Sequence, residues 1–543
     1  MVKRVSGNIV DVPGKEIFPG TLIIADGRIT DIVREDNQYP HYIIPGFIDA
    51  HVHIESSMLV PSEFARIAAV HGTVATVSDP HEIANVLGTD GVRYMIDNAR
   101  SVPVRFYFGA PSCVPATEFE TSGAALGISE VEELLKMPEI HYLGEVMNFP
   151  GVISGNTEVH EKIRLAQKYG KPADGHAPGL RGNDLKKYLS AGISTDHETL
   201  SREEGIEKIR LGMKLLIREG SAAKNFDELI TLVDKYPEQC MFCSDDAHPD
   251  ALQQGNINLM VARAARLGID HMKVLQAACV NPVRHYGLHA GLLRIGDSAD
   301  FLIVNNLKDF TVLSTCIQGM AVAEAGKSLI PRTEVKMINR FCAERKKTDD
   351  FRLHVRSDRI RVIEAIDEQL ITGSLTAAVS ATGGNAVSSV ERNLHKIVVV
   401  NRYQETAPAI GFIRNFGLTR GAIASSIAHD SHNIIATGVS DEDICRAVNL
   451  VIAHKGGICA VSGDKEMILP LPVAGIMSNE EHTDVAAKYS ALDSMAKELG
   501  SMLSAPFMTL SFMALPVIPK LKITDKGLFD AERFRYVDLF VNL

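Results

Sequence analysis

The sequence predicts an α/β protein whose centre is a (β/α)8 barrel of the TIM type. A small β-sandwich domain built from both flanks and a further C-terminal α+β domain are expected beside it. Three observations lead to this fold class: eight strand-like runs alternate with amphipathic segments in the centre, short strand-like runs lie on both sides of them, and the pattern changes after about residue 350. At roughly 100–200 residues per domain, 543 residues allow three or four domains.

The predicted barrel spans residues 45–289. Its strand-like runs begin near residues 46, 72, 104, 140, 172, 193, 213 and 240. Between them, segments such as SEFARIAAVH and EVHEKIRLAQKYG carry helical periodicity and end near Gly or Pro. Eight such units in about 245 residues match the strand count and length of a (β/α)8 barrel. A doubly wound open sheet is the alternative, but no Gly-rich first turn supports it.

The flanks predict two further units. GNIVDV and GTLIIADGRITDIV near the N-terminus, and GLLRIGDSADFLIVNN and MAVAEAGKSLI after the barrel, indicate short antiparallel strands. Residues 1–44 plus 290–345 are therefore expected to form one β-sandwich domain around the barrel. Residues 350–543 are expected to form an α+β domain, in which RIRVIEAIDEQL is a strand passing into a helix, HKIVVVNRY and GGICAVSG are strands, and VAAKYSALDSMAKELGSML is a helix.

Composition excludes several classes of partner. The chain has 56 Lys+Arg against 67 Asp+Glu, and this net charge of −11 argues against a nucleic-acid binder. The N-terminus lacks the apolar core of a signal peptide. The apolar stretch APFMTLSFMALPVIP (505–519) is broken by prolines and too short to span a bilayer. Eight cysteines without framework spacing indicate reduced thiols, so a cytoplasmic protein is expected.

Polar residues at the ends of the predicted strands indicate where chemistry occurs, because that face of a barrel builds the active site. A lone His there is more often structural, and a lone Asp is often a helix N-cap. Four imidazoles and two carboxylates in barrel order instead indicate a centre of two divalent cations that activates water for hydrolysis of a C–N or similar bond. The strand-end motifs are Asp49-x-His51-x-His53, Gly144-Glu145, Gly175-His176, Asp196-His197-Glu198 and Ser244-Asp245-Asp246.

A resemblance adds to this interpretation. PGFIDAHVHIESS resembles the opening strand of the amidohydrolase superfamily. SDPHEIANV, LGEVMNFPGV, DGHAPGL, STDHE, CSDDAHPD and SIAHDSHNIIATG are similar to the bacterial-type adenine deaminases over essentially the whole chain. The resemblance implies hydrolysis of adenine to hypoxanthine and ammonia at a binuclear centre, usually of Mn²⁺ or Fe²⁺, with Zn²⁺ as an alternative. Adenine is then the small-molecule partner, and a homodimer is the expected assembly.

The resemblance also implies roles for particular residues. His51 and His53 would bind one metal ion together with Asp245, His176 and His197 would bind the other, and Glu145 would bridge them. A metal-bridging hydroxide would attack C6 of adenine, and Asp245 would carry its proton to the departing amine. Many superfamily members bridge with a carbamylated lysine, so Glu145 counts against a dihydroorotase or hydantoinase.

Several assignments stay open at this point. Asp246 is an alternative ligand to Asp245. The acid that protonates N1 of the ring is expected to be Glu55 or Glu82, although either could be an exposed loop carboxylate. The cluster of His429, Asp430 and His432, with Asn433, would bind substrate as a lid over the pocket or would form a polar turn between two strands.

Other functions are weighed against adenine deamination. An amidohydrolase acting on another nucleobase, on adenosine or on a cyclic amide would have the same metal centre, because loops set the substrate. A non-catalytic scaffold that keeps the barrel is the remote alternative, since such a protein would be expected to lose its metal ligands.

Overall fold

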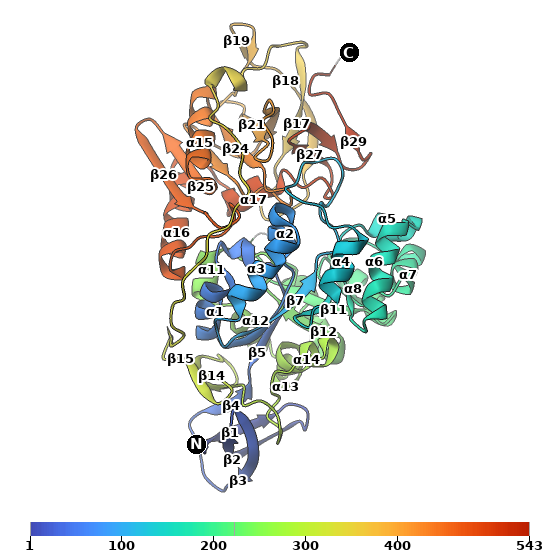
Figure 1. The fold of residues 1–543 in the computed structure, drawn as a ribbon, viewed down its shortest axis with the longest axis vertical. Helices are drawn as coiled ribbons and strands as arrows, with labels where there is room; N and C mark the ends of the chain where they lie inside the picture. Colours follow the sequence, from blue (N-terminus) through green and yellow to red (C-terminus); the bar gives the residue numbers. More distant parts are fainter. Residues whose placement is uncertain (1, 222, 542–543) are drawn as a thin grey trace.

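The computed structural model describes residues 2–221 and 223–541. Three units are stacked along the long axis of the molecule, with the N-terminal strands at one end, a barrel in the middle and a C-terminal unit at the other end (Figure 1). In this described part of the chain, no helix combines the length and the hydropathy that a membrane crossing requires.

The central unit is the predicted (β/α)8 barrel. Within the described residues its strands are parallel and form sheets of five and three strands, which an isolated bridge between Ala173 and Ile193 joins on one side. A parallel bridge between Val52 and Asp245 closes the barrel on the other side. The strands are β5 (Phe47–Val52), β6 (Thr73–Ser78), β7 (Arg105–Ala110), β8 (Ile140–Val146), β9 (Ala173–Gly175), β10 (Thr195–Asp196), β11 (Lys214–Arg218) and β12 (Cys240–Cys243).

These strands begin within two residues of the predicted positions. Their residues are almost all buried, because the layer of helices covers the outer face of the barrel and side chains fill its interior. The helices are α1 (Pro61–Val70), α2 (His81–Leu87), α3 (Thr89–Ala99), α4 (Ile128–Leu135), α5 (Phe149–Ser154), α6 (Thr157–Lys168), α7 (Gly182–Ser190), α8 (Arg202–Arg210), α9 (Phe226–Leu229), α10 (Thr231–Lys235), α11 (Pro249–Gln254), α12 (Ile257–Arg266), α13 (His271–Leu275) and α14 (Asn281–Tyr286).

Strands from both flanks of the barrel form one mixed sheet. Strand β4 pairs parallel with β1 and antiparallel with β13, so segments more than 250 residues apart in sequence lie side by side. The order in the described residues is β16-β15-β14-β13-β4-β1-β2-β3. The strands are β1 (Lys3–Asp11), β2 (Glu16–Ala25), β3 (Arg28–Arg34), β4 (Tyr42–Pro45), β13 (Phe301–Val304), β14 (Val312–Ile317), β15 (Met320–Glu324) and β16 (Lys327–Ser328).

The C-terminal unit is built on a second mixed sheet, with the order β18-β17-β22-β21-β24-β23-β25-β26 in the described residues. Helix α15 (Asp441–Ala453) packs on β23, β24 and β25, and α16 (His482–Glu498) and α17 (Pro506–Phe512) also contact the sheet. The strands are β17 (Arg359–Glu364), β18 (Gly373–Ala378), β21 (Leu394–Val400), β22 (Ala409–Arg414), β23 (Ala422–Ser425), β24 (Ile434–Gly438), β25 (Gly457–Ser462) and β26 (Lys465–Pro470). Short strands β19 (Ala381–Thr382), β20 (Asn385–Ala386), β27 (Leu521–Thr524), β28 (Gly527–Asp530) and β29 (Arg535–Tyr536) complete it.

One local prediction in this unit is wrong. RIRVIEAIDEQL was expected to pass from a strand into a helix, but β17 is followed by a turn and not by a helix. The amide of Ala365 donates to the carbonyl of Arg414, so the backbone continues its pairing with the neighbouring strand beyond the end of β17. The amide of Gln369 then closes a turn on Ile366, which leads the chain into β18.

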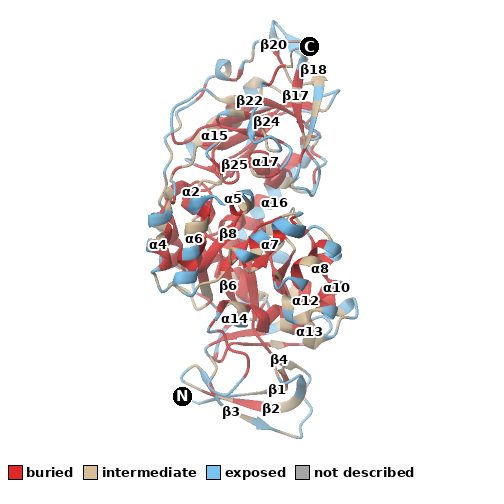
Figure 2. Ribbon diagram, turned by 90° about the vertical axis from the view of Figure 1, so that its right-hand side faces the viewer, coloured by how far each residue is buried: buried red, intermediate tan, exposed pale blue. Residues whose placement is uncertain are grey.

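The C-terminal unit sits on the carboxyl ends of the barrel strands. One hydrophobic core runs through both units and includes Met58 and Leu59 of the barrel and Met477 and Tyr489 of the C-terminal unit. Figure 2 shows buried residues on both sides of this junction. The amide of Ser478 donates to the carbonyl of Met58 at 2.8 Å. The C-terminal unit therefore covers the face on which a barrel carries its active site.

Candidate metal centre and active site

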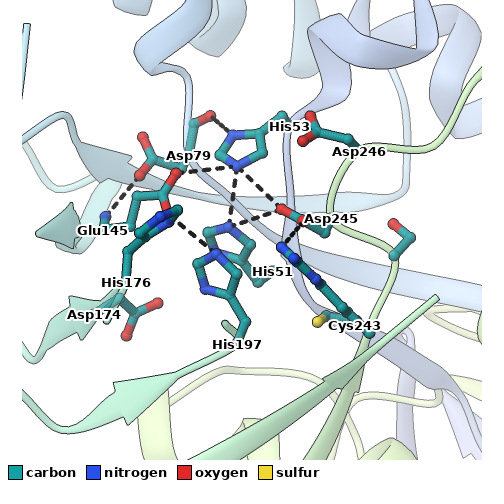
Figure 3. Close-up of polar contacts among 12 residues, drawn as sticks. His51, His53, Asp79, Glu145, Asp174, His176, His197, Cys243, Asp245 and Asp246 are labelled. Carbon is teal, nitrogen blue, oxygen red and sulfur yellow. Dashed lines mark hydrogen bonds and ion pairs between the residues drawn. The ribbon is translucent and has the colours of Figure 1, made fainter. Parts of the chain in front are cut away.

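Six side chains at the carboxyl ends of the barrel strands converge, and all of them are buried. His51 and His53 come from β5 and the residue just after it, and their Nε2 atoms are 3.1 Å apart. Asp245, just after β12, places Oδ1 3.5 Å from Nε2 of His51 and 3.3 Å from Nε2 of His53. Figure 3 shows this convergence for the full set of His51, His53, Glu145, His176, His197 and Asp245.

Glu145, near the end of β8, lies between two groups of imidazoles. Its Oε1 is 3.3 Å from Nε2 of His53, while its Oε2 is 2.7 Å from Nδ1 of His176 and 3.1 Å from Nε2 of His197. One carboxylate thus reaches both halves of the cluster, which is the placement that a bridging ligand needs.

Hydrogen bonds around the barrel closure hold Asp245 and His51 in place. Asp49, at the start of the β5 motif, accepts from the backbone amide of Ser244 at 2.9 Å and from its hydroxyl. The amide of Asp245 donates to the carbonyl of His51, and the amide of His53 donates to the carbonyl of Asp245. Asp245 has a φ of +53°, a left-handed conformation that is uncommon for a residue other than glycine. The neighbouring strand keeps this residue in that conformation, as is frequent at functional sites.

Asp79, after β6, orients both Glu145 and His53. Its Oδ2 accepts from the amide of Glu145 at 2.8 Å, and its carbonyl lies 3.1 Å from Nδ1 of His53, which leaves Nε2 of that imidazole facing the cluster. A partner on the second ring nitrogen is the usual way in which proteins orient a histidine ligand. Gly144 permits this arrangement, since a Cβ at that position would lie 2.4 Å from Oδ2 of Asp79.

The protonation states fit a cation site. Burial, and then the proximity of His197, lowers the pKa of His51 to about 4, so its imidazole is neutral and able to bind metal at neutral pH. Burial opposes ionisation of Glu145, but His176 and His197 outweigh it and keep the pKa well below its ordinary value. His53 is also buried, yet Asp245 and Glu145 raise its pKa well above the ordinary value. Asp245 and Glu145 thus favour a positive charge beside His53. A metal ion bound there would compete with the proton on this imidazole.

The ligand atoms are also close enough for metal binding. The side chains of His51, His53 and Asp245 each offer one atom within 4.8 Å of the others, and the same holds for His51, Glu145 and His197. Imidazole nitrogens and carboxylate oxygens together suit divalent Zn, Mn, Fe or Co. The residues therefore fit a centre of divalent metal ions.

A second polar cluster joins the barrel to the C-terminal unit beside this centre. Glu82, on α2, has Oε1 2.5 Å from Nδ1 of His429 and also contacts Nε2 of His432. His81 lies 3.5 Å from Glu82 and 3.9 Å from Oδ2 of Asp430. Burial opposes protonation of His429, but the carboxylate of Glu82 raises its pKa to about 9. Burial, and then Glu82, raises the pKa of Asp430 to about 7.

A cavity lies over the centre. Small-molecule sites of this kind are concave and combine apolar walls with a few polar groups. Its floor comes from the barrel and its walls come partly from the C-terminal unit. The lining residues are His53, His81, Glu82, Glu145, Met147, His176, His197, Glu198, Asp245, Asp246, Leu370, His429, Asp430, Phe512, Leu515 and Ile518.

The other expected site residues differ in whether they reach the cavity. Glu82, His429 and Asp430 line the cavity, and His432 lies behind them against Glu82. Glu55 is buried and its Oε1 accepts from the amide of Ile83 at 3.2 Å, but it is not among the lining residues. Asp246 also lines the cavity, and its Oδ1 accepts from the hydroxyl of Ser56 at 2.5 Å.

Sequence reasoning missed several residues of the site. Arg218, the last residue of β11, contacts Asp245, and an arginine at the end of the seventh predicted strand was a usable signal. His81 precedes Glu82 in the DPHE motif, in which only the glutamate was predicted to be a site residue. Phe512, Leu515 and Ile518 belong to the apolar stretch 505–519, whose contribution to the cavity wall depends on tertiary packing.

A family comparison agrees with the barrel and the site. The model of the Amidohydrolase family matches residues 42–322, which is more than half of the chain. The fold and the site thus define a member of the amidohydrolase family, and the family implies a divalent metal ion.

The rest of the chain and the most similar relatives narrow this class. The model of the Adenine deaminase C-terminal domain matches residues 369–535. Adenine deaminase of Sulfurovum sp. is 55% identical over 98% of this chain and 99% of its own length. Those of Salinibacter ruber and Methanosarcina mazei are 53% and 50% identical, over 99% and 100% of both chains. The chain belongs to the adenine deaminases of the amidohydrolase family.

Proposed function

We propose that this protein hydrolyses adenine to hypoxanthine and ammonia at a divalent-metal centre beneath the cavity. The observation that carries the proposal is the convergence of six buried ligand side chains, with Glu145 between two groups of imidazoles, in a chain whose relatives are adenine deaminases. The cavity brings polar groups of the barrel and of the C-terminal unit together over this centre, as recognition of a small polar heterocycle requires.

The proposed ligand set is divided between two ions. His51, His53 and Asp245 would hold one ion, His176 and His197 the other, and Glu145 would contact both. Ions held in this way lower the pKa of a bound water molecule, so that hydroxide is available near neutral pH. We propose Mn²⁺ or Fe²⁺ as the native metal, with Zn²⁺ as a further candidate.

Asp245 would act as the proton carrier of the reaction. Its Oδ1 faces the imidazoles and the cavity, and it would accept a proton from the attacking water and deliver it to the amino group leaving C6. The C6–O bond forms, the C6–N bond breaks, and ammonia departs.

The second polar cluster would bind the purine ring. Glu82 and His429 would supply the proton that N1 needs for C6 to become electrophilic, and Asp430 would accept a hydrogen bond from a ring N–H. Glu55 is the weaker candidate for the N1 acid, because it does not line the cavity. The contact of His432 with Glu82 would fix the orientation of that carboxylate.

The test pairs metal content with ammonia release. Protein reconstituted with Mn²⁺ is expected to bind about two ions per chain and to release ammonia from adenine, and Glu145→Gln is expected to lose both properties. Glu139→Gln, which changes an exposed ion pair with Arg100 at the other end of β8, is the matched control.

The substrate is tested on the same preparation. Turnover of adenine is compared with that of guanine, cytosine, adenosine and a cyclic amide, since a site built for adenine leaves polar groups unpaired with the others. Two ions without adenine turnover would leave a metal-dependent hydrolase and discard this substrate. Full metal content and activity in Glu145→Gln would discard the ligand set.

Four finer features are also proposals. The domain division is 1–44 plus 290–345, 45–289 and 350–543, the assembly is a homodimer, the location is cytoplasmic, and nucleic acid and membranes are not partners. Sedimentation of the purified chain tests the homodimer, because one folded chain of 59.1 kDa gives a distinct value.

A further inference from the structure

Arg218 is a buried cation among the carboxylates of the site. Only 4% of this residue is exposed. Its Nη2 donates to Oε2 of Glu198 at 2.9 Å, and its Nη1 contacts Oε1 of the same carboxylate. The same Nη1 donates to Oδ2 of Asp245 at 2.6 Å. One guanidinium therefore joins the carboxylate after β10 to the carboxylate after β12.

This contact gives the two oxygens of Asp245 different roles. Oδ2 is held by Arg218, whereas Oδ1 faces His51 and His53 at 3.5 and 3.3 Å. The backbone of Asp245 is held by its pairing with β5, so rotation of the carboxylate is the freedom that remains. The guanidinium removes that freedom.

Glu198 keeps the guanidinium in this orientation, and Asn225 holds the backbone of Arg218. Glu198 accepts from both terminal nitrogens, the fork-like pairing that suits arginine and not lysine. The side-chain oxygen of Asn225 accepts from the backbone amide of Arg218 at 2.8 Å, while its amide group donates to the carbonyl of His197 at 3.0 Å. The ends of neighbouring strands are thereby tied to the residue that holds Asp245.

We propose that Arg218 is a positioning residue of the deamination reaction, which holds Oδ2 of Asp245 so that only Oδ1 faces the reacting groups. Glu198 serves this role by fixing the guanidinium. The inference rests on the proposed function, because it assumes that Asp245 carries the proton. A carboxylate displaced by about 1 Å can cost roughly 100-fold in rate, even when the substrate still binds.

The first experiment replaces Arg218 by lysine, which keeps the charge but removes the fork. Arg218→Lys, reconstituted with Mn²⁺, is expected to lose about 100-fold in kcat for adenine while KM changes by less than about threefold. Its metal content and melting temperature are expected to match those of the wild type. Arg105→Lys, which alters an arginine–carboxylate pair with Asp300 at the opposite end of the barrel, is the control and keeps its kcat.

The second experiment leaves the arginine in place. Glu198→Gln keeps the shape of the side chain but weakens the pairing, and it is expected to lower kcat with little change in KM or metal content. In the double variant with Arg218→Lys, kcat is expected to fall no further than in the worse single variant. The reason is that both changes disrupt the same Arg218–Glu198 pair that holds Asp245. Glu198→Gln tests the proposal even where Arg218→Lys does not fold.

Two results would overturn the inference. One is a folded Arg218→Lys or Glu198→Gln protein with the wild-type kcat, and the other is a loss of activity that follows a proportional loss of metal or of folded protein. A wild-type protein that does not turn over adenine would instead contradict the proposed function, so the two failures are distinguishable.

Discussion

At the scale of single residues, the site distinguishes two adjacent carboxylates that the sequence alone did not separate. Asp245 faces His51 and His53, whereas Asp246 accepts a hydrogen bond from Ser56. The left-handed backbone of Asp245 turns its side chain toward the imidazoles. The two carboxylates therefore have different surroundings, which is the basis for proposing different roles for them.

Asp245→Asn is expected to lower kcat for adenine by about 10²–10⁴-fold, the range typical of a lost general acid–base group. Asp246→Asn is the matched control and is expected to stay within about tenfold of the wild type. Steady-state kinetics on Mn²⁺-loaded protein measures both variants. A larger loss in the Asp246 variant would reverse the assignment.

At the scale of elements, β8 depends on a close approach that only glycine allows. Oδ2 of Asp79 lies 2.4 Å from the position that a Cβ on Gly144 would take, and the same oxygen accepts from the amide of Glu145. The strand therefore carries its functional glutamate directly beside the residue that must stay small.

Gly144→Ala is expected to lower the free energy of unfolding by about 1–3 kcal/mol, the usual cost of overpacking, and to reduce the metal content by displacing Asp79. Chemical denaturation and metal analysis measure the two effects. Gly127→Ala is the control, because a Cβ there meets only a glutamate oxygen, at 3.1 Å. Equal behaviour of the two variants would argue against the role of Gly144.

Strand β27 supports the cavity wall through a buried lysine. Nζ of Lys522 donates to the carbonyls of Leu370 and Phe512, two residues that line the cavity. Burial lowers the pKa of Lys522 to about 7. In the unfolded chain this lysine keeps a pKa near 10.4, so the unfolded state binds more protons between these two values and the stability rises with pH there.

Lys522→Met removes this pH dependence. When the pH falls from 9.5 to 7, the free energy of unfolding is expected to drop by at least about 1.4 kcal/mol more in the wild type than in the variant. This amount corresponds to a shift of one pKa unit. Chemical denaturation at the two pH values measures it. Lys497→Met, a change at an exposed lysine, is the control, and a shift of equal size in that variant would refute the assignment.

The elements show how far sequence reasoning reaches. The eight barrel strands were predicted within two residues, because buried runs between Gly and Pro carry a strong local signal. The side chains expected as ligands could be predicted to lie together, since each ends a strand and the ends of parallel strands meet, but their role as ligands stays a prediction. The helix after residue 364 was wrongly predicted, because its periodicity competes with pairing to Arg414. Arg218, His81 and Phe512 were missed because their roles depend on which distant residues they contact.

At the scale of the whole molecule, the C-terminal unit shares one hydrophobic core with the barrel that carries the metal centre. The hydrophobic core continues from the barrel into the C-terminal unit, and Glu82 contacts His429 and His432 across the junction. Without cations, several carboxylates are buried close together. Bound metal is therefore expected to stabilise the folded chain as a whole.

Mn²⁺ at about 100 times its dissociation constant is expected to add roughly 2.7 kcal/mol to the stability of the apoprotein. For a chain of this length this corresponds to a rise of about 2–3 °C in the melting temperature. Differential scanning calorimetry of protein treated with a chelator and then reloaded measures the shift. Glu145→Gln is expected to show little of it, and an equal shift in that variant would mean that the ions bind elsewhere.

The late position of the cavity wall has a consequence for protein synthesis. Phe512, Leu515 and Ile518 form part of the wall around barrel residues that the ribosome assembles between about 270 and 460 positions earlier. A nascent chain that ends before residue 505 lacks this part of the wall, so its centre would stay open to bulk water. Activity should thus begin only when translation has almost finished, and a message cut short before residue 505 should encode an inactive chain.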